Sequence, residues 1–275
     1  MKVRVLPESN YRAIYSNGKT LRLAIDPRLP IKQLDYPEFY DVKITSACNG
    51  GCPYCYQSSN SDGEHYADVP EKVRRLFGGM TENQRPFQVA IGGGEPTLHP
   101  QFDEICKTFS ELGIDPNYTT NGTSMTDAVM ETTMRYVNGV AVSCHEHLPW
   151  RDGVRTLLDA GIYTNLHIII SDDASVDSFL AIRNEFAGKV KYFVLLPMVA
   201  QGRATSEMTC WPYLREQLGA LDSRKDIAFG AMFYPYLRDV DWGISLYEPE
   251  AMSRYLVMDD EMRQYPSSFS IDRAA

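Results

Sequence analysis

Three cysteines stand close together in the N-terminal part of the chain. Cys48, Cys52 and Cys55 lie in the segment TSACNGGCPYCYQSS, with three and then two residues between them. Thiolates are soft ligands that suit iron–sulfur clusters or zinc, and Gly50 and Gly51 allow the backbone to wrap tightly around a bound metal. Three ligands cannot complete a four-cysteine site. Either a remote residue supplies the fourth ligand, or one metal position stays open, as it does in catalytic centres.

The spacing alone leaves two kinds of metal site open. One is a structural zinc or iron–sulfur site in a non-catalytic barrel protein, with a distant fourth ligand such as His65 in the zinc case. The other is a catalytic iron–sulfur cluster with an open coordination position. A disulfide framework is not expected, because such frameworks are typical of short secreted chains. The remaining cysteines, Cys106, Cys144 and Cys210, are scattered, and we expect them to be single thiols.

The elements that must position these residues alternate between strands and helices. Short runs rich in β-branched and aromatic residues predict six buried parallel strands, at residues 41–45, 87–91, 114–120, 140–143, 164–170 and 191–196. Apolar residues at helical spacing predict the helices between them, most clearly with the face Phe102, Ile105, Cys106, Phe109 and Leu112. Because six strand–helix units are visible rather than eight, we predict an α/β fold with a partial (β/α)6 TIM-like barrel. Functional residues should then gather at the C-terminal ends of the strands.

The barrel divides the chain into three predicted parts. Residues 1–40 form an N-terminal β extension, because Asn17-Gly18 between two β-like runs predicts a hairpin. Residues 41–205 form the barrel. Residues 206–275 form a C-terminal extension that packs on the barrel, in which the runs RYLVM and SFSI predict a small hairpin.

Short motifs follow the predicted strands in chain order. They are Gly92-Gly93-Gly94-Glu95-Pro96 after the second strand, Thr120-Asn121-Gly122 at the end of the third, Ser143 at the end of the fourth, Leu157-Leu158 with Ala160-Gly161 before the fifth, and Gly202-Arg203-Ala204 after the sixth. Together with Cys-x3-Cys-x2-Cys and the aromatic Tyr54 before the last cysteine, this ordered set resembles the radical S-adenosylmethionine (SAM) superfamily. The resemblance spans residues 41–204 and is closest to the peptide- and protein-modifying members.

The resemblance implies two cofactors, a [4Fe–4S] cluster and SAM. Cys48, Cys52 and Cys55 would bind three irons, and SAM would chelate the fourth through its amine and carboxylate. Reduction of the cluster would cleave SAM to methionine and a 5′-deoxyadenosyl radical that abstracts hydrogen from a substrate. The implied partners are a small-molecule or peptide substrate and a one-electron donor such as a flavodoxin or ferredoxin.

The resemblance also assigns residues to SAM. They are Tyr54 near the adenine, Gly93, Gly94 and Glu95 at the amine, Ser143 and Asn165 near the ribose and methionine ends, and Arg151 at the carboxylate. Plainer alternatives stay open, because a glycine run also forms tight turns and Ser143 could cap a turn. Asn165 could be a hydrogen-bonded residue at a barrel end, and Arg151 could form a surface salt bridge.

The segment Ser143-Cys144-His145-Glu146-His147 follows the fourth predicted strand at the barrel mouth. Cys144 and His145 are candidate substrate contacts there. With His147 they could instead ligate a second metal, or all three could be plain loop residues.

Charge and composition narrow the function further. The formal net charge is -9 and the pI about 5.1, which opposes non-specific nucleic-acid binding. No apolar run approaches the length of a membrane helix, and the N-terminal residues do not resemble a secretion signal, so we expect a soluble cytoplasmic protein.

After Ala204 the chain contains only Cys210, and one cysteine cannot hold an auxiliary cluster. We therefore predict a single cluster.

Overall fold

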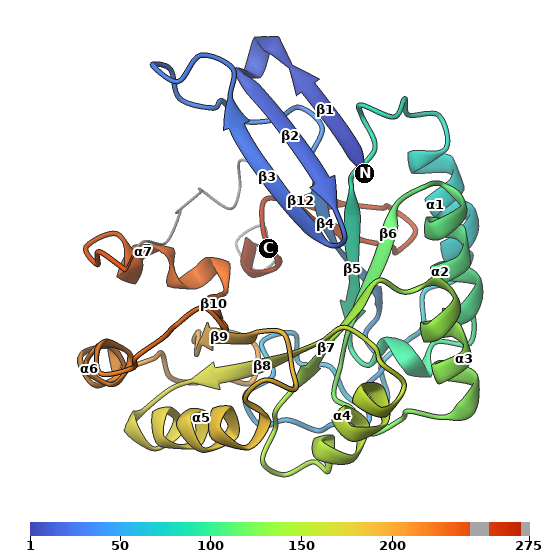
Figure 1. Cartoon of the computed structure of the whole chain (residues 1–275). Helices are drawn as coiled ribbons and strands as arrows, with labels where there is room; N and C mark the ends of the chain where they lie inside the picture. Colours follow the sequence, from blue (N-terminus) through green and yellow to red (C-terminus); the bar gives the residue numbers. More distant parts are fainter. Residues whose placement is uncertain (243–252, 271–275) are drawn as a thin grey trace.

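The computed structural model describes residues 1–242 and 253–270, and its centre is a nine-stranded sheet with the order β10-β9-β8-β7-β6-β5-β4-β11-β12. The six predicted strands are all present, as β4 (Phe39–Thr45), β5 (Gln88–Gly93), β6 (Asp115–Thr120), β7 (Gly139–Ser143), β8 (Thr164–Ile170) and β9 (Phe193–Pro197). They pair in parallel with their neighbours in chain order. The curved sheet stays open within the described residues, so the partial α/β barrel is confirmed (Figure 1).

Five helices cover the outer face of this sheet (Figure 1). They are α1 (Val69–Phe77), α2 (Phe102–Glu111), α3 (Asp127–Tyr136), α4 (Trp150–Asp159) and α5 (Asp173–Phe186). The predicted apolar face of α2 is confirmed, because Phe102, Ile105, Cys106 and Phe109 are all buried in the main core. Asp172 caps the start of α5 by accepting a hydrogen bond from the Ser175 N–H, as an N-cap residue should.

The strands alternate between two environments, as the pleat of a sheet requires. On β4, Tyr40, Val42 and Ile44 are buried against the helices. The intervening Asp41 therefore faces the interior of the barrel. The same alternation on β8 turns His167 inward.

The C-terminal part of the chain extends the sheet at both edges. Its elements are α6 (Trp211–Gly219), β10 (Ile227–Phe229), η3 (Ala231–Phe233), α7 (Tyr234–Leu237), β11 (Ser253–Val257) and β12 (Gln264–Tyr265). β10 pairs in parallel with β9, and β11 pairs in parallel with β4. The part expected only to pack on the barrel therefore supplies three strands of the sheet, β10, β11 and β12.

The predicted C-terminal hairpin is partly wrong. β11 does carry the RYLVM run, but its antiparallel partner is β12 and not SFSI. Pro266 follows β12, and proline ends a strand because it cannot donate to the ladder. Residues 268–270 form a helical turn instead, and residue 271 lies outside the described residues.

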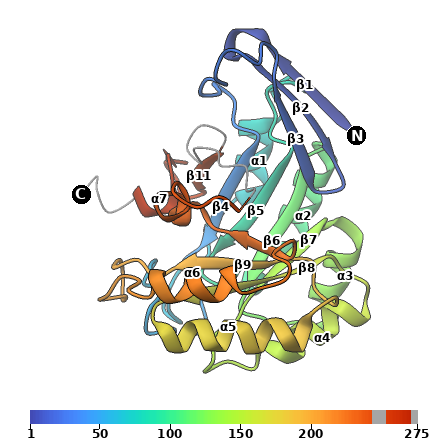
Figure 2. The ribbon, with the colours of Figure 1, turned by 60° about the vertical axis from the view of Figure 1, so that its left-hand side comes forward.

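The N-terminal extension forms a separate three-stranded sheet of β1 (Lys2–Leu6), β2 (Tyr11–Ser16) and β3 (Lys19–Ala24), with η1 (Pro7–Ser9) after β1. The predicted hairpin is present, because Asn17 and Gly18 have φ values of 50° and 72°, as a two-residue type I′ turn requires. In Figures 1 and 2 this sheet projects from one end of the molecule, away from α4 and α5.

Two contacts of Asp115, at the start of β6, hold the N-terminal sheet against the barrel. The Tyr15 hydroxyl donates to its carboxylate at 2.7 Å, and Lys2 Nζ lies 2.8 Å from the other oxygen. A small apolar cluster packs beside them, made of Tyr11, Ala13, Tyr15, Leu34 and Phe87. The sheet thus sits at the N-terminal ends of the barrel strands.

Across the described ranges, every helix is too short or too polar to cross a membrane.

Candidate functional site

A cavity of about 460 Å³ opens inside the curved sheet. Its lining includes nine of the twelve residues that the sequence singled out as binding or contact residues: Cys48, Cys52, Tyr54, Cys55, Gly93, Gly94, Glu95, Ser143 and His145. They come from the loop after β4 and from the C-terminal ends of β5 and β7, the end of a parallel sheet where ligands bind. Arg151, Asn165 and Cys144 are not part of the lining.

Two sulfurs of the cysteine loop, those of Cys48 and Cys52, lie on either side of Gly50. A Cβ atom at Gly50 would lie 3.4 Å from Cys48 Sγ and 3.5 Å from Cys52 Sγ, so a side chain there would fill the gap between them. Burial and the neighbouring cysteines raise the pKa of the Cys48 thiol, and that of Cys52 to about 11. Soft sulfur ligands gathered at a cavity wall fit an iron–sulfur cluster, and bound metal would supply the positive charge that holds them as thiolates.

The Gly202-Arg203 passage braces this loop from behind. Arg203 Nε donates to the Cys52 carbonyl at 2.9 Å, and its backbone N–H donates to the Cys55 carbonyl at 3.0 Å. A Cβ at Gly202 would lie 2.4 Å from the Tyr56 carbonyl oxygen. This motif therefore needs glycine for close approach and arginine to satisfy carbonyls of the loop.

Gly93 and Gly94 bring the end of β5 against the same loop. The N–H groups of Gly94 and Glu95 donate to the carbonyls of Thr45 and Ala47, both at 2.8 Å. A Cβ would lie 2.2 Å from Thr45 O at Gly93, and 2.0 Å from Ala47 O at Gly94. The glycines thus serve backbone contact, and these two N–H groups are already used within the protein.

The Glu95 carboxylate is buried and accepts hydrogen bonds from three residues. Its Oε1 accepts from the N–H and hydroxyl of Thr97, at 3.3 and 2.7 Å, and from the Thr120 hydroxyl at 2.8 Å. Its Oε2 accepts from the Asn121 N–H at 2.7 Å. Burial raises the pKa of Glu95, while these donors favour the ionised form. Glu95 therefore joins the ends of β5 and β6.

His145 and His147 hold the cysteine loop from the β7 side. His145 Nδ1 lies 3.1 Å from the Tyr54 hydroxyl, and His147 Nε2 lies 3.0 Å from the Gly50 carbonyl. Burial lowers the pKa of His145 to about 4, helped by the neighbouring His147, so the His145 ring is neutral near pH 7. These bonds explain part of the histidine segment without a second metal.

Cys144, the other expected substrate contact, is not brought to the cavity. Ser143 faces the interior, so the pleat turns Cys144 outward, where it packs against the main core. Burial raises the pKa of its thiol above the ordinary range. The expectation for Cys144 is therefore corrected.

Two residues assigned to SAM by resemblance also lie elsewhere. Arg151 Nε pairs with Glu185 at 2.9 Å, and its guanidinium lies 4.3 Å from the centre of the Trp150 ring, so it forms the surface salt bridge of the plainer alternative. Asn165 is the second residue of β8 and thus lies at the N-terminal end of that strand. Its Oδ1 is buried without a hydrogen-bond partner among the described residues.

The zinc hypothesis finds no fourth ligand in His65. The His65 Nδ1 atom lies 2.9 Å from the Thr45 hydroxyl, and its ring packs 5.2 Å from His99. Within residues 1–242 and 253–270, no three His, Cys, Asp or Glu side chains converge as ligands of a single ion.

Sequence reasoning missed several polar residues of the cavity. Asp41 on β4 and His167 on β8 line it, as do Tyr56 and Tyr255. Burial raises the pKa of Asp41 to about 7 and lowers that of His167 to about 4. A signal existed, because a charged or imidazole residue at an inward position of an apolar strand is unusual.

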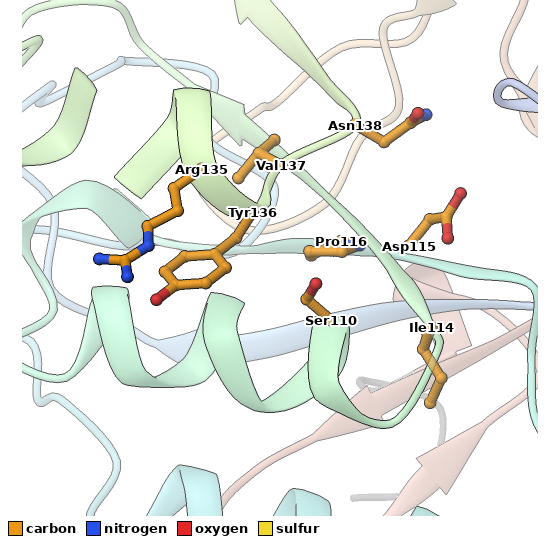
Figure 3. A pocket seen from close by; sticks show the side chains of 8 residues that line it. All are labelled: Ser110, Ile114, Asp115, Pro116, Arg135, Tyr136, Val137 and Asn138. Carbon is orange, nitrogen blue, oxygen red and sulfur yellow. The ribbon is translucent and has the colours of Figure 1, made fainter. Parts of the chain in front are cut away.

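A second hollow of about 280 Å³ lies at the opposite end of β6 (Figure 3). Its residues, Ser110, Ile114, Asp115, Pro116, Arg135, Tyr136, Val137 and Asn138, include none that the sequence singled out. Asp115 is already paired with Lys2 and Tyr15. The larger cavity is therefore the candidate functional site.

Comparison with known proteins agrees with this assignment. Residues 42–149 match the family model of the Radical SAM superfamily. The chain is 32% identical over 84 residues to a probable GTP 3′,8-cyclase of Pyrococcus horikoshii, a match that covers 30% of this chain and 26% of that protein. It is 31% identical over 102 residues to the mycofactocin maturase MftC of Mycobacterium tuberculosis, which covers 35% of this chain and 24% of the relative. The matches thus span about a quarter of either relative.

A solved structure shares the fold over most of the chain. SuiB of Streptococcus suis, bound to its precursor peptide SuiA, superposes with a TM-score of 0.67 over 87% of this chain and 61% of SuiB. The sequence identity is 14%, so this likeness concerns the fold alone.

Proposed function

We propose, from the match of residues 42–149 to the family model of the Radical SAM superfamily, that the protein is a radical SAM enzyme that binds one [4Fe–4S] cluster through Cys48, Cys52 and Cys55. The observation that carries the proposal is the convergence of these cysteines with Tyr54, the end of β5 and Ser143 around one cavity. Three separate segments of the sequence meet there, at the end of the sheet where α/β folds bind ligands.

When bound, a reduced [4Fe–4S] cluster and SAM would supply hydrogen-abstracting radical chemistry at this cavity. The residues of the chain itself would bind SAM and shield the reactive species from water. Tyr54, held by His145, offers a ring for the adenine, and carbonyl groups at the end of β5 accept from the SAM amine. Ser143, which lines the cavity, would contact the ribose. The segment 266–269 lines the cavity with Phe269 stacked 4.7 Å from Tyr56, and so helps to keep water from a reactive species.

We further propose that the substrate is a peptide or protein side chain and that a flavodoxin or ferredoxin supplies the electron. SuiB, which has the same fold, was solved with a precursor peptide, and this supports the substrate class. A cytoplasmic location suits the six free cysteines, because that compartment keeps thiols reduced.

The first experiment tests cluster and chemistry together. The protein is reconstituted without oxygen, reduced, and assayed for 5′-deoxyadenosine formed from SAM. We expect about four iron atoms per chain and release of the nucleoside. The variant Cys52→Ala should lose both, while Cys106→Ala should keep both, because Cys106 is a residue of α2 that is buried in the core, outside the cavity.

Two results would contradict the proposal. Bound zinc with no cluster formation would favour a structural metal protein, and equal iron content in Cys52→Ala and wild type would remove the cysteine loop from the site. Iron near twice the expected content would overturn the single-cluster prediction.

A further inference from the structure

The cavity is larger than the part that SAM would use. The residues proposed for SAM lie at the C-terminal ends of β5 and β7 and on the cysteine loop. A second part of the lining is formed by β4, β8, β9 and β11 and carries no residue assigned to a cofactor. A cavity of this size falls within the range of about 300–1,000 Å³ that small-molecule sites occupy.

One wall of this second part is polar. Asp41, Tyr56, Gln57 and Tyr255 line it. Gln57 joins the tyrosines, because its Nε2 donates to the Tyr56 hydroxyl at 2.7 Å and its Oε1 accepts from the Tyr255 hydroxyl at 3.3 Å. The polar groups of Tyr56, Gln57 and Tyr255 therefore partly satisfy one another's hydrogen-bonding capacity.

Asp41 is the exception in that wall. Its carboxylate makes no hydrogen bond or ion pair with any residue of the described ranges, and desolvation is the cause of its raised pKa. The side chain is exposed and faces the cavity. It lies four residues before the end of β4, which places it about 13 Å from that end of the strand. A carboxylate that faces a cavity without a protein partner is available to accept hydrogen bonds from a ligand.

The wall across the cavity is largely apolar, with His167 on β8 as its polar residue. Ile169 on β8 with Val194 and Leu196 on β9 face the cavity, and register pairs Ile169 with Leu196. Beside Asp41, the inward positions of β5 are Ala90 and Gly92, whose small size leaves room for a bound chain. The site therefore offers an aliphatic surface on β8 and β9 and the carboxylate of Asp41 facing it, while His167 and Arg254 also belong to the lining.

We propose that this part of the cavity binds an alkyl chain that ends in an ammonium or guanidinium group, as lysine and arginine side chains do, with Asp41 as the anchor of the cationic end. This inference rests on the proposed function, because it names the class of substrate group that would face the radical. The aliphatic stem packs on Ile169, Val194 and Leu196, and the cation pairs with Asp41 through charge-assisted hydrogen bonds.

The test measures binding to the reconstituted, SAM-bound and unreduced protein, so that no turnover occurs. The probes are n-pentylamine, which is protonated at neutral pH, 1-pentanol and pentanoate, with affinities measured by saturation-transfer NMR. We expect pentylammonium to bind about tenfold more tightly than pentanol, and pentanoate to bind least, because a charge-assisted pair with Asp41 is worth at least that factor.

Variants locate the effect. Asp41→Asn should remove the tenfold advantage and leave pentanol binding unchanged. Val194→Thr should weaken both probes alike, and Asp35→Asn, an exposed aspartate outside the cavity, should change neither. SAM affinity and cluster absorption, measured on the same samples, report whether each variant is folded.

Several outcomes would overturn the inference. Equal binding of pentylammonium to wild type and Asp41→Asn would do so, as would pentanoate binding as tightly as pentylammonium or no pentylammonium binding at all. Loss of SAM affinity in Asp41→Asn would instead assign Asp41 to the cofactor. The ranking of probes on the wild-type protein decides the matter even where a variant does not fold. A protein that binds pentylammonium yet forms no 5′-deoxyadenosine would separate this inference from the proposed function.

Discussion

The Glu95 carboxylate accepts four hydrogen bonds from Thr97, Thr120 and Asn121, on segments that follow β5 and β6. Such a buried acceptor is expensive to disturb, because removing one partner leaves desolvated groups unpaired. Glu95 therefore connects the C-terminal ends of β5 and β6. Any contact between Glu95 and SAM would depend on this connection.

Glu95→Gln should destabilise the protein by about 2–3 kcal/mol, because the new NH2 group must face at least one of the present donors. The free energy of unfolding, from denaturant titration, measures this. Glu131→Gln on the exposed face of α3 is the matched control and should stay within about 0.5 kcal/mol of wild type. An equally stable Glu95→Gln would show that the carboxylate does not hold the two strand ends.

Part of the site could be predicted from the residue types in the sequence. The cysteines, Tyr54 and Ser143 were recognisable from motif and order. Asp41 and His167 were not, because their role depends on which side of a strand faces the cavity, and a one-residue change of phase reverses that side. The same phase explains why Cys144, next to Ser143, points away.

The contact between the end of β5 and the cysteine loop is the element on which the site depends. Gly94 faces the Ala47 carbonyl so closely that any Cβ would overlap it, whereas a Cβ at Gly92 would meet no atom within 4 Å. Gly94 therefore permits a close backbone contact, whereas Gly92 of the same motif is not needed for one.

Gly94→Ala should separate β5 from the cysteine loop and lower both iron content and the melting temperature, because the overlap with backbone at 2.0 Å cannot relax by a side-chain movement. Gly92→Ala should retain the wild-type melting temperature. Iron analysis and thermal unfolding of both variants measure the difference. Similar behaviour of the two variants would contradict the close-contact explanation.

Strand prediction succeeded where the pattern was local. β4 to β9 are short runs, most of them rich in β-branched and aromatic residues, that are separated by helical patterns, and each pairs with its neighbour in the chain. β11 was not recognised as a barrel strand, because its parallel partner is β4, with Ser253 opposite Phe39. Pairing between segments so far apart in sequence leaves no local signal.

At the scale of the whole molecule, the N-terminal sheet and the barrel meet around Asp115. Lys2 and Tyr15 reach its carboxylate from β1 and β2. The outer face of that sheet is apolar, since Val3, Val5, Leu21 and Leu23 are 41 to 56% exposed. The sheet therefore depends on its inner face for attachment.

Asp115→Asn should loosen the N-terminal sheet without unfolding the barrel. The change removes the ion pair with Lys2 and weakens the acceptor for Tyr15, at a cost of about 1 kcal/mol for partly exposed groups. Limited proteolysis should then cut faster within residues 1–34, with fragments identified by mass spectrometry. Unchanged cleavage, with Asp226→Asn as a second-site comparison, would show that the sheet is held by its other contacts, which are the apolar cluster and the hydrogen bonds of Arg4 to the Tyr36 and Arg85 carbonyls.

The pairing of β11 with β4 also determines when the sheet can be completed during synthesis of the chain. β4 leaves the ribosome early, but the strand beside it is made only after all the other barrel strands, and long-range parallel pairing forms slowly. Until then the edge of β4 is unpaired and the cysteine loop lacks part of its cover, a state prone to aggregation and proteolysis. Delivery of iron and sulfide is therefore best timed after residues 253–257 have been synthesised, and ribosomes that stall before that point would release chains that cannot protect a cluster.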